Sequence, residues 1–534
     1  MDLKTIEAEL KRLYQAVSVC EFEEARNGAK SLYSQVHDDI EKSPVFYLVI
    51  SNIAGILIDL EHMKPCPSSS QDGLNILVDH KDGIIEQIGE AAYYYNLSNA
   101  KSNLVKVKNP FEHSFSSIEQ LVEVKTDLWK AVNLDKFSSK SHVDPTYIVN
   151  LGNSLKQQFR ITEALECYDL VNSLNLDIPQ SWVNRSATLL MLNTVSKSYT
   201  IEMLEQIKRG YENVLLSNEV PPIWMEHYKG QVDFHQNKIN QIVKQSGIEQ
   251  VLHDNDKTRE EYERLSDYRR FCLDNNLSLS EHALYCPCVA SSRDNLTILT
   301  SDGIAGEFVI PMEMVLNRLK SEFSFARHLY FEYLTSDIDH ELLHDSCFSE
   351  LLNDELLGVE VEKLRTAFRT CFGILDKIAV AICELLDASP KNKNIYFQNF
   401  WRLDQEERRE LFNKHKCPGL LALYSIATDL NKNKNGEWSF LKQLRNDLEH
   451  EFVVVHKSEE PNDVYSSYQY MENIVFVKEE LFIEHLKRLL QLTRSAIFSF
   501  VFTVRDKALS EIIDEDVAIP KRIYPQDLVT DPNK

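Results

Sequence analysis

Glycine and proline are scarce in this chain, with 15 and 16 copies among 534 residues. Because proteins built only of strands need many tight turns, which use these two residues, the scarcity argues against an all-β protein. No window reaches eighteen consecutive apolar residues, so no membrane span is expected. The first ten residues, MDLKTIEAEL, do not resemble a signal peptide, and we therefore expect a cytoplasmic protein.

Positive charge is also in deficit, since the formal net charge is −24 and the pI is near 5.2. A chain this acidic does not coat nucleic acid without specificity, so any RNA contact requires a local basic patch. The sequence has neither a glycine-rich phosphate loop nor an acidic cluster that would hold two Mg²⁺ ions. These absences argue against a nucleotidyltransferase or another Mg²⁺ enzyme, and we expect no cofactor.

The 10 cysteines are mostly isolated inside apolar segments, as expected for free thiols in a reducing compartment. Cys286 and Cys288 form the one close pair. Their single-residue spacing is short for a zinc knuckle, and no second pair is near in the sequence. We therefore expect two ordinary thiols there and no metal site.

Leucine, glutamate, lysine and isoleucine dominate long stretches, which favours helices. The predicted fold class is all-α with a small β-containing insert. Successive amphipathic helices fill residues 1–250, a junction with short strands occupies 251–312, a helical bundle occupies 313–510, and a polar tail covers 511–534. The strands of the junction are expected in the short runs ALYCPCV, LTILT and GEFVIP.

The clearest unit of the first region runs from Asp144 to Leu190, with Ile148 and Trp182 one 34-residue period apart. This segment resembles the tetratricopeptide repeat (TPR) family, whose repeat has that length. It departs from the family at Phe159, where a glycine is usual before the second helix. A generic array of helical hairpins remains the alternative. Either array builds a concave surface that suits a protein or ligand partner.

Four or five helices are expected in the bundle, and apolar residues three and four positions apart form one stripe on the first two of them. They cover residues 314–334, 363–387, 417–430, 438–452 and 478–507. The fourth helix carries the one short constellation that looks chemical, Leu444-Arg445-Asn446-Asp447-Leu448-Glu449-His450. Asn446 and His450 are four residues apart and share a face, whereas Arg445 lies roughly 140° around the helix from His450. A second copy of the helix, facing the first, would bring two such sets into one cleft.

RNA cleavage by the 2′-hydroxyl needs these side chains. A histidine with a pKa near neutrality can transfer protons, and arginine offers a planar donor fork to phosphate oxygens. Asn446 can hold the imidazole or a non-bridging oxygen, and none of these roles needs a metal. By itself the motif is also compatible with a surface ion pair between Arg445 and Glu449 beside an exposed histidine.

The segment RNDLEH resembles the conserved motif of the HEPN ribonucleases, in which an arginine, a polar residue and a later histidine recur. Several separated segments between Tyr268 and Phe502 resemble, in order and spacing, the branch of that family with amino-terminal TPR-like repeats. The resemblance implies a metal-independent endoribonuclease that forms a homodimer with a composite site. It assigns phosphate stabilisation to Arg445, acid–base catalysis to His450 and the polar position to Asn446. It further implies a toxin or anti-phage effector, which we expect the repeats to gate through a protein or ligand trigger.

Arg327 lies in an apolar helical segment, so it either pairs with an acid or faces the cleft and binds substrate. Loop lysines could form the basic patch that an acidic nuclease needs, although solvated loop lysines are common. These are Lys432 and Lys434, with Lys391, Lys393, Lys414 and Lys416 as further members. The alternative function is a non-catalytic scaffold that dimerises through the bundle and binds a protein or nucleotide partner.

Overall fold

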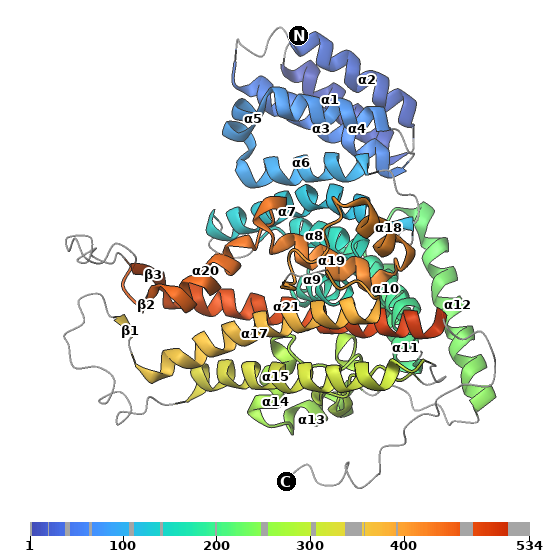
Figure 1. The fold of residues 1–534 in the computed structure, drawn as a ribbon. Helices are drawn as coiled ribbons and strands as arrows, with labels where there is room; N and C mark the ends of the chain where they lie inside the picture. The colour runs from blue at the N-terminus through green and yellow to red at the C-terminus, as the bar shows by residue number, and fades with distance from the viewer. Residues whose placement is uncertain are drawn as a thin grey trace. The chain divides into compact units, whose positions relative to one another are not determined.

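The structure is a computed structural model of the whole chain (Figure 1). It describes residues 3–19, 21–37, 43–63, 67–105, 112–138, 143–197, 200–246, 255–300, 306–336, 355–356, 358–390, 394–459 and 474–510. The predicted tail, 511–534, lies outside these residues. The chain folds into two compact units, one formed by residues up to Gln158 with Asn433–Glu437, the other by Phe159–Lys432 and the residues from Trp438.

The first unit is helical, and its consecutive helices pack against one another. A continuous apolar core fills the space between its first six helices, with Ile50, Ile53 and Leu57 fully buried. The helices are α1 (Leu3–Ser18), α2 (Phe22–Val36), α3 (Val45–Met63), α4 (Pro67–Asp79), α5 (Lys81–Ile88), α6 (Glu90–Leu104), α7 (Phe115–Ser138) and α8 (Pro145–Gln157). An array of helices is what the periodicity of this region predicted.

The second unit begins with Phe159, which has a positive φ of 58° at the position where the TPR family usually has glycine. A non-glycine residue is strained in this region of backbone space, and burial of the phenyl ring, only 3% exposed, offsets the strain. The helices that follow are α9 (Ile161–Ser173), α10 (Pro179–Ser196), α11 (Ile201–Leu215) and α12 (Pro222–Ser246). The sequence placed a domain boundary near residue 250, whereas α9–α12 belong to the same compact unit as the bundle.

The bundle is built around α21 (Glu479–Ser510), which packs against α9, α10, α15, α17 and α19. Residues 492–505 of α21 are buried on every side. The helices around it are α15 (Val309–Thr335), α17 (Val359–Leu385), α18 (Glu406–Lys414), α19 (Pro418–Asp429) and α20 (Ser439–His450). The helices expected from the apolar stripes are all present, and Figure 1 shows α15 and α17 side by side.

Gly419 permits the close approach of α19 to α21. A Cβ atom on Gly419 would lie 2.5 Å from the carbonyl oxygen of Ser499 and 2.6 Å from the amide nitrogen of Thr503. Both atoms belong to the backbone of α21 and cannot move aside cheaply. The α21 residues at this contact are Ser499 and Thr503, and their small side chains leave room for the two helices to approach.

The small sheet has three strands, β1 (Glu355–Leu356), β2 (Phe452–His456) and β3 (Ile474–Lys478). β1 pairs antiparallel with β2, and β2 pairs parallel with β3, with Phe452 opposite Ile474. β2 directly follows α20, and β3 directly precedes α21. The sheet therefore ties the helix with the Arg–Asn–His motif to the central helix of the bundle.

The predicted strands of the junction are absent from its described residues, which exclude 251–254 and 301–305. The segment contains α13 (Asn255–Glu263), α14 (Asp267–Asp274), η3 (His282–Leu284) and η4 (Val289–Ser292), and GEFVIP runs into the start of α15. Side chains from the bundle satisfy the backbone here in place of a neighbouring strand. Arg505 donates to the carbonyls of Thr297 and Ile298, and Glu313 accepts from the Ile298 amide. The fold class was therefore correct, but the strands lie elsewhere.

A buried ionic cluster joins α9 to the bundle. Glu163 of α9 pairs with Arg160 at 2.7 Å and with Arg488 of α21 at 2.7 Å, and Arg160 also pairs with Asp429. Burial alone would raise the pKa of Glu163, but the charges of Arg160 and Arg488 outweigh it and lower this pKa to about 2. At pH values above 4.5, the ordinary pKa of this carboxyl group, the ion pairs of Glu163 therefore stabilise the folded state in full. This stabilisation is lost as the pH falls through about 2.

We expect Glu163→Gln to destabilise the protein at pH 7, because the buried Arg160 and the half-buried Arg488 lose their shared carboxylate. The difference in unfolding free energy between wild type and variant should shrink as the pH falls from about 4.5 towards 2. Chemical denaturation across this range measures the difference, with the exposed Glu260→Gln as control. A difference that does not depend on pH would contradict the assignment.

No helix in the described part of the chain combines the length and apolar character needed to cross a membrane.

Candidate functional site

The predicted motif lies on α20, which ends at His450. Leu441 and Leu444 are the buried residues of this helix, and it packs against α17. The Trp438 amide donates to the Asp429 carbonyl at 3.0 Å, which fixes the start of α20 to the end of α19. After His450 the backbone turns extended at Glu451 and enters β2. The helix that carries the motif is therefore fixed by α19 at its start and continues into β2 at its end.

Arg445 and Asn446 are half-buried, and His450 is exposed as the last residue of α20. One guanidinium nitrogen of Arg445 donates to the Asn446 Oδ1 atom at 3.2 Å. Since the helix is continuous from Arg445 to His450, the two side chains leave it about 140° apart. The structure thus brings Arg445 and Asn446 together and leaves His450 at the helix end. Within the described residues the His450 ring forms no hydrogen bond or ion pair.

The surface ion pair between Arg445 and Glu449 does not form, and Arg445 makes no other ion pair within the described part of the chain. Arg445 does act electrostatically on Asp376 of α17. Burial raises the pKa of Asp376, while the Phe397 amide and the charges of Arg445 and Lys442 oppose that rise. Most of the guanidinium donors of Arg445 therefore remain available to an anion.

Three further cations belong to α17 and α20, and two of them, Arg365 and Arg369, pair with Glu362 at 2.5 and 3.7 Å. Arg365 donates to the Val453 carbonyl at 2.6 Å, so the start of β2 lies against α17. Arg369 follows Arg365 by four residues and shares its face, and Lys442 precedes Arg445 by three. Sequence reasoning did not select these cations. Helical spacing alone could have found Lys442, but Arg365 and Arg369 required the contact between α17, α20 and β2.

The proposed substrate-binding role of Arg327 is wrong. Its side chain is fully buried and pairs with Asp294 at 2.7 Å. It also donates to the Leu277 carbonyl at 2.6 Å and the Tyr268 hydroxyl at 3.0 Å. These partners belong to the junction, so Arg327 fixes the junction to α15 and is not accessible to RNA.

Arg327→Met is expected to lower the unfolding free energy by about 3–5 kcal/mol, because it leaves Asp294 without its buried partner. Denaturant unfolding measures the loss. The control is Arg318→Met on the same helix, where an exposed pair with Glu322 contributes about 0–1 kcal/mol. Equal stabilities of the two variants would argue against the structural role of Arg327.

The predicted lysine patch is only partly near the motif. Lys432 and Lys434 lie in η5 (Lys432–Lys434), before the start of α20, while His450 ends that helix. His450 lies roughly 17 Å from the first residue of the helix at 1.5 Å per residue, and these lysines precede that first residue in the chain. Lys434 also pairs with Glu119 at 2.5 Å, whereas Lys432 is exposed. Lys391 and Lys393 lie outside the described residues.

The helical bundle carries an arginine, a polar residue and a histidine on α20, and comparison with protein families gives a match over this bundle. Residues 306–507 match the family model described as LA2681-like HEPN, so this part of the chain is a HEPN domain. The match extends from just before α15 nearly to the end of α21 and includes the whole of α20. No curated protein matches the chain.

Proposed function

We propose that the protein is a metal-independent endoribonuclease that acts through Arg445, Asn446 and His450. The observation that carries the proposal is that the arginine and the histidine of the motif lack ionic partners within a HEPN domain. Arg445 and His450 make no ion pair with any residue the structure describes, although acidic residues are abundant in the chain. A structural arginine on so acidic a protein is expected to have a carboxylate partner, as Arg327 does.

The proposed reaction is transfer of a phosphodiester to the adjacent 2′-hydroxyl. The 2′-oxygen forms a bond to phosphorus as its proton leaves to a base, and the bond from phosphorus to the 5′-oxygen breaks. The 5′-oxygen takes up a proton, so the products are a 2′,3′-cyclic phosphate and a free 5′-hydroxyl. His450 transfers protons, because an imidazole changes charge near neutral pH. Arg445 stabilises the negative charge that develops on the phosphorane.

Two copies of α20 are needed to assemble this site. Arg445 and His450 leave one helix in directions that differ by about 140°, so a single copy does not aim both at one phosphate. A two-fold axis beside α20 would place the arginine of one subunit near the histidine of its partner. The proposed active form is therefore a homodimer whose cleft contains two Arg–Asn–His sets.

Arg445 and Lys442 of α20 supply the local positive charge that an acidic ribonuclease requires. Lys442 lies about one helical turn before Arg445, and phosphate contacts by such side chains provide most of the affinity for RNA. Sequence specificity needs contacts to bases, which these charges do not provide. The helices before the HEPN domain are the proposed receiver of a protein or ligand trigger, which would restrain a toxin or anti-phage effector until it is required.

Cleavage of total RNA and of transfer RNA by the purified full-length chain in EDTA tests the proposal. We expect cleavage that persists in the chelator and leaves 2′,3′-cyclic phosphate ends, identified by mass spectrometry of the fragments. If the purified protein is inactive, growth arrest on expression of the wild type and its relief by His450→Ala would still support a gated enzyme. The absence of both cleavage and growth arrest would favour the scaffold, which dimerises and binds a partner without catalysis.

A further inference from the structure

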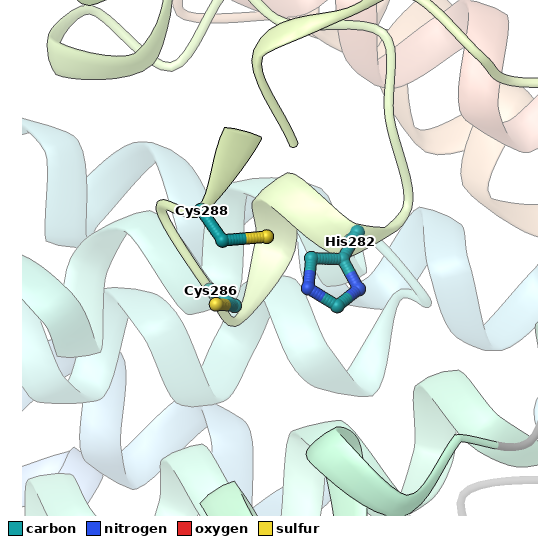
Figure 2. A group of neighbouring side chains, drawn as sticks. All are labelled: His282, Cys286 and Cys288. Atoms are coloured by element: carbon teal, nitrogen blue, oxygen red, sulfur yellow. The ribbon is translucent and has the colours of Figure 1, made fainter. Parts of the chain in front are cut away.

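Three potential metal ligands meet on the junction loop, remote in sequence from the HEPN motif. His282 begins η3, and Cys286 and Cys288 follow on the same turn of the chain. The donor atoms of the three side chains all lie within 4.8 Å of one another. Figure 2 shows the Cys288 sulfur directed towards the His282 imidazole, with Cys286 beside them on the loop.

We propose that His282, Cys286 and Cys288 bind a zinc ion. Two thiolates and one imidazole are the soft and intermediate donors that zinc takes in proteins. The group includes no carboxylate, which disfavours Mg²⁺ and Ca²⁺ because these cations require oxygen ligands. Two thiolates also neutralise the charge of Zn²⁺, so the complex adds no net charge to a partly buried site.

The loop is held in the ligand geometry by contacts that do not involve a metal. The Cys286 amide donates to the His282 carbonyl at 3.0 Å, which closes the turn and brings the first and second ligands together. The hydroxyl of Ser291 donates to the Cys288 carbonyl at 2.5 Å. The His282 ring packs against the Tyr285 ring with a centroid distance of 4.8 Å. A zinc ion would therefore find its ligands already ordered, and little conformational entropy would be lost on binding.

A surface pocket lies beside the loop that carries the three ligands. Cys286 is buried and Cys288 is half-buried, but Tyr285 and Pro287 on either side of Cys286 line a pocket that opens to the surface. Arg185 and Arg209 line the same pocket. With three protein ligands in the described part of the chain, a tetrahedral ion keeps one position for water or an exogenous ligand.

The ion would stabilise a loop that binds side chains of the bundle helices α15 and α21. Arg494 of α21 donates to the Ser278 carbonyl at 2.9 Å, and Arg505 of α21 pairs with Glu281, the residue before His282, at 2.6 Å. Arg327 of α15 donates to Leu277 in the same loop. Because zinc binds the folded loop and not the unfolded chain in this geometry, its removal is expected to lower the melting temperature of the whole unit.

The first measurement is the metal content of the full-length chain, purified without a histidine tag and analysed by mass spectrometry of the elements. We expect about one zinc per chain, and replacement by Co²⁺ should produce the thiolate charge-transfer absorption of a tetrahedral site. Cys286→Ser and Cys288→Ser should each reduce zinc affinity by at least about tenfold, since even loss of an outer-shell partner costs about 10–100-fold. His282→Cys should keep the metal because it replaces one ligand by another.

Cys167→Ser is the matched control, because Cys167 is a half-buried free thiol outside the group. It should leave the zinc content unchanged. Cobalt absorption by the wild type does not depend on the folding of any variant and therefore decides the proposal alone if a variant unfolds. A wild type without bound zinc and without cobalt absorption would overturn it, as would copper in place of zinc or a disulfide between Cys286 and Cys288.

Discussion

His450→Ala is expected to lower kcat for RNA cleavage by about 10²–10⁴-fold, the usual contribution of a positioned acid or base. The fold should be unaffected, because His450 is exposed at the end of α20 and a surface substitution of this kind changes stability by about 0.5 kcal/mol or less. Steady-state cleavage of a short defined RNA measures the first effect, and thermal unfolding measures the second. Together they separate a catalytic role from a structural one.

Glu449→Ala is the matched control for His450→Ala, since Glu449 is the exposed neighbour on the same helix turn. It should retain cleavage close to that of the wild type. Retained cleavage by His450→Ala, after removal of contaminating nuclease, would refute the site assignment. A loss of activity in both variants would point to disruption of the end of α20 instead of a missing proton-transfer group.

Arg445→Ala is expected to lower kcat by about 10²–10³-fold, as observed when one donor to a developing oxyanion is removed. Arg445→Lys should recover only part of the loss, because a lysine keeps the charge but lacks the planar fork of donors. The buried face of α20, formed by Leu441 and Leu444, is untouched by either substitution. An Arg445→Lys variant as active as wild type would show that charge alone matters at this position.

Mixing the two inactive variants tests whether the site is shared between subunits. In a dimer of one Arg445→Ala subunit and one His450→Ala subunit, one shared site regains both an intact arginine and an intact histidine. After subunit exchange at equal concentrations we expect about a quarter of wild-type activity, because half of the dimers are mixed and each has one of two sites. Mixed dimers that form and remain inactive would contradict the composite site.

The helices of the bundle could be predicted from the sequence because burial of one helix face imposes an apolar stripe every three to four residues. The stripe from Leu364 to Leu385 lies on α17, and the apolar run before Lys507 became α21. The short runs at ALYCPCV and LTILT were misread as strands, because an apolar run of five to seven residues does not reveal what satisfies its backbone. At LTILT the partners are side chains from α15 and α21, because Lys320 donates to the Leu296 carbonyl and Arg505 to the Ile298 carbonyl.

Arg327 shows the same limit for single residues. Its place in an apolar helix was evident from the sequence, but the choice between an ion pair and a cleft depended on where Asp294 would lie. The two residues are 33 positions apart. The pairing was therefore decided by the tertiary fold, and with it the conclusion that Arg327 does not contact substrate.

The sequence by itself determined the helical class and the helix that carries Arg445, Asn446 and His450, because these depend on residues a few positions apart on one helix, while the catalytic role of the three residues stays a prediction. It also contained His282, Cys286 and Cys288, although the spacing of the two cysteines alone argued against a metal. The tertiary structure decided that the three side chains converge, that Arg327 is buried, and that Arg365 donates to the strand that follows the motif. Each depends on the path of a loop or on contacts between distant segments, and local periodicity carries no information about either.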